Sequence, residues 1–276
     1  MSGAVLLEVK GSLALVTLSH PGKLNAMSRA MWRQLRAALE SVQQSADVRC
    51  VLVRGEGGHF CAGGDISEYA GFRFEEAGLR AFHEDDVWGG LQAMLDCDVP
   101  IIAQIEGNCM GAGVEIASCC DIRIAGDTAK FGAPIARLGF PMAPREAALV
   151  MRAAGELTAR EMLLSAAVLG AAEMKQRGFL NQVAPGRDVE ALVNACVDRT
   201  CALAPGAARL NKQTFRALAP IGCAPAAIDL IATAYRYAPS AEHREGIAAF
   251  TEKRPPRFDR RAAEIPTIAS LTHEKP

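Results

Sequence analysis

Short hydrophobic runs that suit β-strands alternate with amphipathic segments along the first half of the chain. Val5–Val9 and Leu13–Leu18 predict two strands joined by a turn at a glycine. Cys50–Val53, Ile101–Ile105 and Ile122–Ala125 are short apolar runs typical of buried strands. Helical patterns separate several of these strands. This order predicts an α/β core with crossover connections.

Helical periodicity fills the gaps between the strands. Ser28 is suited to cap a helix, and the apolar face of that helix repeats at helical spacing. Leu79–Leu95 predicts a second helix, and Thr158 with Glu161 matches the capping box of a third. The members of the first apolar face are Met31, Leu35, Ala38, Leu39 and Val42.

The last third of the chain changes to almost continuous helical patterning. A short helix at Ala172–Arg177 and a strand at Leu180–Val183 come before the change. Four helices are then predicted at Val189–Ala202, Ala207–Leu218, Ala226–Tyr237 and Ala241–Lys253. We place a soft boundary at Ala204-Pro205-Gly206, which divides the chain into a core over 1–204 and a helical C-terminal region over 205–276.

Composition narrows the class of protein. The 276 residues are 50% hydrophobic and 22% charged, as in an ordinary globular chain. A net charge of −1 provides no general attraction for nucleic acid or anionic lipid. No apolar run approaches the roughly 20 residues of a membrane helix, and the N-terminus does not resemble a secretory signal. With nine scattered cysteines and no C-x-x-C pair, we expect a cytoplasmic protein with reduced thiols.

Several common catalytic motifs are missing from the sequence. There is no G-x-G-x-x-G dinucleotide fingerprint, no phosphate-binding P-loop and no G-x-S-x-G nucleophile elbow. The five histidines lack a second ligand at helical spacing, so we expect no metal site. The chemistry must then come from backbone N–H groups, carboxylates and apolar surface.

Two glycine-rich turns carry the most informative chemistry. The first, Gly57–Ile66, follows a buried strand; taken alone, it fits a simple tight turn. The second, Gly107–Gly113, leads into a helix whose first N–H groups lack internal partners and favour a developing negative charge. Glu115 lies three residues after Ala112 and therefore on the same helix face. A surface carboxylate is the alternative reading of Glu115, but its apolar neighbours favour burial and a raised pKa.

Five segments, in order, resemble the crotonase superfamily, also called the enoyl-CoA hydratase/isomerase family. They span nearly the whole chain, and their order and spacing are more specific than any one of them. The segments are His20–Met27, Phe60–Ile66, Gly107–Asp121, Phe131–Gly139 and Phe250–Phe258.

The resemblance implies a fold and an activity. The implied fold is a spiral of ββα units with a helical C-terminal region, assembled as a homotrimer or homohexamer. The implied substrate is an acyl-CoA thioester, so that coenzyme A is part of the substrate and no separate cofactor is needed. The backbone N–H groups of Gly64 and Ala112 would form an oxyanion hole, with Glu115 as acid/base. This is the chemistry of a lyase of fatty acid metabolism.

The same resemblance implies residues that contact the substrate. Ile135 would line the acyl pocket. Phe250 and Lys253 would reach the ligand of a neighbouring subunit, although a solvated charge cluster is as good an interpretation of the basic residues around Lys253. The implied coenzyme A contacts are Lys23, Leu24, Ala26, Ala62, Asp65 and Ile66.

Ile135 is also the main departure from the family pattern. A hydratase of this family uses two glutamates, and the second is expected where this chain has Ile135. Isoleucine transfers no proton and orients no water. Glu146, Arg145 and Glu84 are the candidates to replace the missing group.

The departure leaves several functions open. An enoyl-CoA hydratase or isomerase working through Glu115 is the leading hypothesis, with an acyl-CoA hydrolase or decarboxylase as further options. A protein that binds acyl-CoA without hydrating it is the second hypothesis. RNA binding is a third, and the near-neutral charge argues against it.

Overall fold

The computed structural model describes residues 2–72, 76–135 and 140–218, together with residues 245, 252, 254 and 257. The helix predicted at Ala226–Tyr237 lies outside the described residues, as do Phe250, Lys253 and all but two residues of the helix predicted at Ala241–Lys253. Within these ranges, no helix is long and apolar enough to cross a lipid bilayer.

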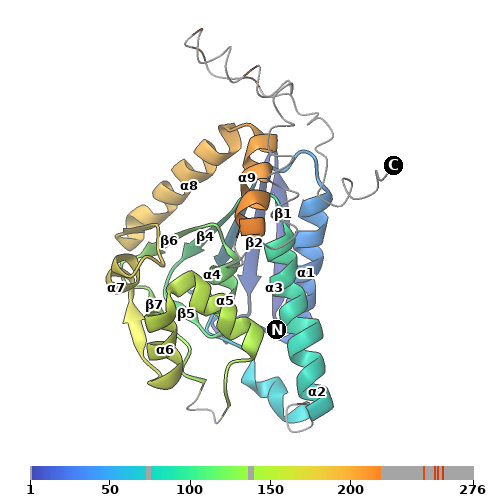
Figure 1. Ribbon diagram of the computed structural model, residues 1–276, viewed down its shortest axis with the longest axis vertical. Helices are drawn as coiled ribbons and strands as arrows, with labels where there is room; N and C mark the ends of the chain where they lie inside the picture. The colour runs from blue at the N-terminus through green and yellow to red at the C-terminus, as the bar shows by residue number, and fades with distance from the viewer. Residues whose placement is uncertain are drawn as a thin grey trace.

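Two sheets and a layer of helices form the described part of the chain (Figure 1). In the larger sheet β1 pairs antiparallel with β2, and every other neighbouring pair is parallel. Its strands, in spatial order, are β1 (Ala4–Lys10), β2 (Leu13–Ser19), β3 (Cys50–Gly55), β4 (Ile101–Ile105), β6 (Ile122–Gly126) and β9 (Gln182–Ala184). The smaller sheet has the order β5 (Asn108–Met110), β7 (Lys130–Gly132) and β8 (Val168–Gly170).

The larger sheet is buried on both faces at its centre. Val51 and Ala103 point into the main core, while Leu52 and Ile102 point into a second cluster on the opposite face. The second cluster is closed by α8 (Gly186–Ala202). Burial on both sides explains the continuous apolar runs of β3 and β4, because such strands have no solvent face that favours alternation.

Helix α1 (Arg29–Gln44) packs beside α3 (Trp88–Asp96) over the main core (Figure 1). The predicted cap is confirmed: the Ser28 hydroxyl accepts a hydrogen bond from the Met31 N–H at 3.2 Å. The predicted apolar face of α1 is buried as well.

The helical structure predicted at Leu79–Leu95 is confirmed, but it is not α-helical throughout. The segment consists of α2 (Glu76–Ala81), a π-helical turn at Phe82–Val87 and α3. Asp86 of the π-helical turn is buried and pairs with two arginines of α1. A strictly α-helical periodicity cannot reveal the wider turn that holds this carboxylate against α1.

The capping box predicted at Thr158 and Glu161 is also wrong. Helix α6 (Glu156–Leu164) starts after Gly155, whose φ of 83° is favourable only for glycine, so Thr158 is buried inside the first turn. Glu161 instead accepts a 2.6 Å hydrogen bond from Arg177. The preceding helix α5 (Pro144–Ala154) begins at a proline, where the missing N–H costs no helical hydrogen bond.

The remaining helices are close to their predicted positions. Helix α4 (Ala112–Cys119) follows β5, and α7 (Ala171–Gln176) precedes β9. Helix α9 (Pro205–Leu218) is tied to the core, because Lys212 donates to the Val99 carbonyl at 3.0 Å and pairs with Asp121 at 2.8 Å. The division of the chain at residue 204 remains a prediction.

Candidate functional site

The turn at Gly64 is held by a single parallel bridge. The Met27 N–H donates to the Gly63 carbonyl, and the Asp65 N–H donates to the Met27 carbonyl, both at 2.8 Å. In this register the N–H of Gly64 points away from Met27. Within the described part of the chain, that N–H has no hydrogen-bond partner.

The turn at Ala112 provides a second available backbone donor. Gly111 has a φ of 48°, and its N–H donates to the Gly132 carbonyl at 2.8 Å. Ala112 is the first residue of α4, so its own N–H has no partner inside the helix. The chain thus reverses at Gly111 and leaves the start of α4 with outward N–H groups.

The two turns lie side by side. Cys61 N–H donates to the Asn108 carbonyl at 2.9 Å, and Met110 N–H donates to the Cys61 carbonyl at 2.8 Å. The approach is so close that a Cβ on Gly113 would lie 2.7 Å from the Cys61 carbonyl oxygen. The structure therefore brings together the segments that carry Gly64 and Ala112, which are far apart in the sequence.

Glu115 lies on the first turn of α4, beside these segments. Its apolar neighbours Val114 and Ile116 are buried, whereas Glu115 itself is partly exposed. Burial, the larger cause, and the nearby negative charge of Glu146 together raise the pKa of Glu115 to about 8. A carboxyl group with this pKa is suited to proton transfer near neutral pH.

The three candidates for the missing second carboxylate occupy different environments. Glu84 and Arg145 are exposed and form an ion pair at 3.0 Å. Glu146 is only 3% exposed, lies on α5 and has His83 Nδ1 3.0 Å from its Oε1. Of the three, Glu146 alone is buried near Glu115. Ile135 is partly buried, directly after Pro134.

The predicted coenzyme A contacts come together around one ion pair. Lys23 Nζ lies 2.7 Å from Asp65 Oδ2. Burial alone would raise the pKa of Asp65, but hydrogen bonds from Lys23 and Ser67 outweigh it and the pKa is lowered. Ala62 N–H donates to the Leu24 carbonyl at 3.0 Å, which fixes the Lys23 loop against the first turn.

Exposed apolar side chains lie next to the Lys23–Asp65 ion pair. Leu24 is 45% exposed and Ile66 is 54% exposed, whereas Ala26 is buried. Leu24 and Asn25 have φ values of 48° and 62°, a left-handed conformation. The Asn25 side chain supports it by donating to the Glu56 and His59 carbonyls, both at 2.8 Å.

An aromatic wall beside Gly64 was not predicted from the sequence. A Cβ on Gly64 would lie 2.1 Å from the Tyr69 hydroxyl oxygen. The Tyr69 ring makes edge contacts with Phe72, Phe82 and Phe140 at centroid distances of 5.9–6.1 Å. The only sequence signal was the pair Tyr69 and Phe72 at helical spacing just after Asp65.

The basic residues near Lys253 include Arg254, which pairs with Glu245 at 2.7 Å.

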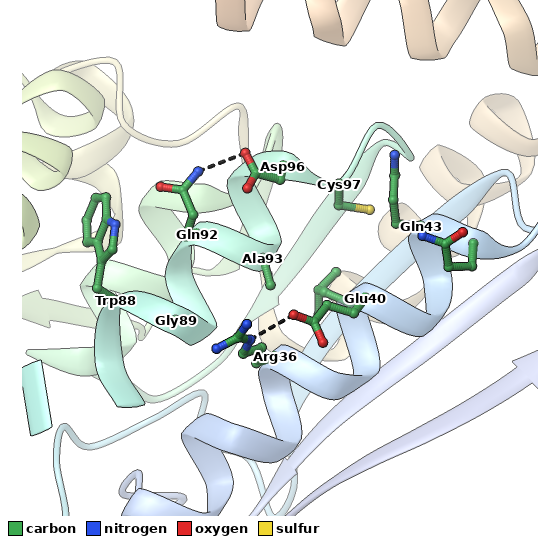
Figure 2. A pocket seen from close by; sticks show the side chains of 11 residues that line it. Arg36, Glu40, Gln43, Trp88, Gly89, Gln92, Ala93, Asp96 and Cys97 are labelled. Carbon is green, nitrogen blue, oxygen red and sulfur yellow. Dashed lines mark hydrogen bonds and ion pairs between the residues drawn. The ribbon is translucent and has the colours of Figure 1, made fainter. Parts of the chain in front are cut away.

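Two surface cavities lie away from the turns. Figure 2 shows one of about 280 Å³ between α1 and α3, where Arg36 pairs with Glu40 and Gln92 with Asp96. The other, of about 660 Å³, lies between α3, α5, α9 and the end of α4. Arg145 lines the larger cavity, but neither cavity is lined by Gly64, Ala112 or Glu115.

Comparison with known proteins identifies the family. The model of the enoyl-CoA hydratase/isomerase family matches residues 8–261. A probable enoyl-CoA hydratase of Rhizobium meliloti is 30% identical over 258 residues, covering 93% of this chain and 98% of the relative. The probable enoyl-CoA hydratase EchA14 of Mycobacterium tuberculosis is 34% identical, covering 82% of this chain and 85% of the relative.

Solved structures agree with this family and its fold. The enoyl-CoA hydratase/carnithine racemase from Magnetospirillum magneticum superposes with a TM-score of 0.88 at 34% identity, covering 93% of this chain and 96% of that one. AtuE of Pseudomonas aeruginosa gives a TM-score of 0.85 at 32% identity, with 92% and 98% coverage. The chain belongs to the enoyl-CoA hydratase/isomerase family, and the crotonase-like fold implied by the sequence is confirmed.

Proposed function

We propose that this protein acts on an acyl-CoA thioester and stabilises its enolate with the N–H groups of Gly64 and Ala112. Glu115 moves the proton. The observation that carries this proposal is the contact between two turns that each leave an N–H available, with a carboxyl group of raised pKa one helical turn away.

The chemical logic starts at the thioester carbonyl. A proton on the adjacent carbon is acidic only when the negative charge that develops on the oxygen is stabilised. Backbone N–H groups fixed before the reaction provide this stabilisation without reorganisation, and one such donor contributes about 2.7–4 kcal/mol. Proton transfer by a positioned carboxyl group contributes a further factor of roughly 10²–10⁴.

The coenzyme A part is assigned to the surface around the Lys23–Asp65 ion pair. Leu24 and Ile66 offer apolar contact area there, and Lys23 offers a cation. The Ala62 N–H joins the two segments by donating to the Leu24 carbonyl, and the Ala26 N–H closes the Lys23 loop by donating to the Lys23 carbonyl. The roles of Phe250 and Lys253 at a neighbouring subunit remain predictions.

Hydration is the leading reaction. The oxygen of water bonds to Cβ of a 2-enoyl thioester while the Cα=Cβ electrons move toward the thioester oxygen. Water loses one proton to a base, and the resulting enolate takes one proton at Cα. Because the pKa of Glu115 is about 8, this residue is mostly protonated at neutral pH and suits the last step.

Double-bond isomerisation is the second candidate, and Ile135 favours it. Isomerisation of a 3-enoyl thioester removes a proton from Cα and returns it at Cγ, so a single carboxyl group suffices. Glu115 must then start ionised. Isomerisation would therefore rise with pH up to about 8, whereas a reaction that needs the protonated form would fall above it.

A turnover screen tests the proposal. Crotonyl-, 3-enoyl-, malonyl- and aryl-CoA thioesters are offered to the wild type, to Glu115→Gln and to Glu40→Gln, an exposed carboxylate on α1 that serves as control. We expect Glu115→Gln to lose a factor of about 10² or more in kcat, with Glu40→Gln unaffected. Full turnover by Glu115→Gln on every accepted thioester would refute the role of Glu115. Tight binding without turnover by the wild type would favour the binding protein.

A further inference from the structure

A buried carboxylate on α5 has no role in the mechanism so far. Glu146 is 3% exposed and lies in the first turn of α5, the helix that packs against α4. Burying a carboxylate is costly unless it has partners. Its hydrogen-bond partner in the described part of the chain is His83, with Nδ1 at 3.0 Å from Oε1.

His83 is itself held in an unusual place. It belongs to the π-helical turn Phe82–Val87, a type of turn that is rare and frequent at functional sites. The same turn is anchored by Asp86, which pairs with Arg29 at 2.6 Å and Arg33 at 2.7 Å. The His83 side chain is 21% exposed, and its contact with Glu146 joins the π-helical turn to α5.

Helix α4, which carries Glu115, packs against α5, which carries Glu146. The negative charge of Glu146 acts directly on Glu115, and His83 faces Glu146 from the π-helical turn. The other charged groups nearby are Arg145, which is engaged at the surface by Glu84, and Arg152 in the last turn of α5. Glu146 is therefore the negative charge that acts on Glu115.

We propose that Glu146, fixed by His83, is the positioning residue that takes the place of the carboxylate missing at Ile135. Two carboxyl groups that share one site cannot both be ionised at low cost, so one of them keeps a proton. Glu146 is held by its hydrogen bond with His83, whereas the raised pKa of Glu115 lets that residue keep a proton and deliver it. When the environment separates the pKa values of two such groups, the group with the higher pKa is the acid of the site and the other is the base.

This inference rests on the proposed function, and it makes the site suited to hydration rather than to isomerisation by Glu115 alone. The choice between hydration and isomerisation then depends on Glu146, which lies eleven positions beyond Ile135 in the sequence and on a different element. Removing the negative charge at position 146 lowers the pKa of Glu115, although burial continues to raise it.

The test reads the proton on Glu115 directly. Protein labelled with carbon-13 at the glutamate carboxyls is titrated by NMR, with the Glu115 signal assigned from Glu115→Gln. We expect a midpoint near 8 in the wild type. Glu146→Gln lowers the midpoint, Glu146→Asp keeps it, and Glu84→Gln, which removes an exposed carboxylate beside His83, leaves it unchanged. An unchanged midpoint in Glu146→Gln overturns the proposal, because a merely structural residue would not move it.

Kinetics separates this inference from the proposed function. In the turnover assay, Glu146→Gln and His83→Asn each reduce kcat by about tenfold or more, and the double variant loses no more than either single one, as expected for residues that act as a unit. Additive losses overturn the pairing. If the wild type turns over no acyl-CoA thioester, the proposed function fails while the NMR midpoints still decide whether Glu146 controls the proton on Glu115.

Discussion

Glu115 combines a position near solvent with a strongly raised pKa, and this has a consequence for stability. The folded-state pKa of about 8 lies above the ordinary value of 4.5, so the folded protein binds more protons than the unfolded chain between these pH values. Stability therefore falls as pH rises from about 4.5 to 8.

The variant Glu115→Gln removes this pH-dependent loss. Its free energy of unfolding should exceed that of the wild type by an amount that grows from pH 5 to pH 8, on the order of a few kcal/mol at the upper end. Urea unfolding of both proteins at several pH values measures the difference. A difference that is constant with pH would show that the folded state does not hold the proton.

Gly64 is the second residue whose environment leads to a prediction. Any Cβ at this position meets the Tyr69 hydroxyl at 2.1 Å, and Tyr69 is fixed by aromatic neighbours. Gly64→Ala should lower kcat/KM by at least about tenfold, because the N–H of residue 64 shifts from its place.

The combination Gly64→Ala with Tyr69→Phe should recover part of that loss, since it removes the colliding oxygen. Gly170→Ala, where a Cβ meets open space, is the matched control and should be neutral. If Gly64→Ala alone retained wild-type kcat/KM, the N–H of this residue would not be placed by the contact with Tyr69.

Among the helices and strands, those that are long or buried on both faces were the ones that could be predicted from the sequence. Strands β3 and β4 were predicted because each is a continuous apolar run, and α1 because its cap and its apolar face agree. Strands β5, β7 and β8 have three residues each, too few for a period to show, and they pair with segments distant in sequence. The π-helical turn could not be predicted, because the apolar positions around it continue at α-helical spacing.

The residues of the candidate site likewise include some that the sequence indicated and some that it could not. Gly64, Ala112 and Glu115 lie in glycine-rich segments whose order marks the family, so the sequence indicated them. Tyr69 and the His83–Glu146 pair depend on how α5 and the π-helical turn pack, and no local pattern encodes that distance. Glu146 was one of three equal candidates until burial separated it from the exposed Glu84–Arg145 pair.

One face of α6 bears on the self-association that the family resemblance implies. Leu157 and Leu164 are 82% and 78% exposed and lie seven residues apart on α6, hence on one helix face. Exposed apolar side chains gathered on one face mark interaction sites more often than single ones do. We propose that this face of α6 is buried between copies of the chain in a homotrimer or homohexamer.

Light scattering during size-exclusion chromatography tests the assembly. The wild type should have three or six times the mass of one chain, 29.3 kDa, and the double variant Leu157→Glu/Leu164→Glu should shift toward the monomer, because each buried leucine contributes about 1.5–3 kcal/mol. Arg187→Glu, an exposed charge change on α8, is the control and should keep the wild-type mass. A monomeric wild type at micromolar concentration would contradict the assembly, whereas an oligomeric double variant would place the contact on another face.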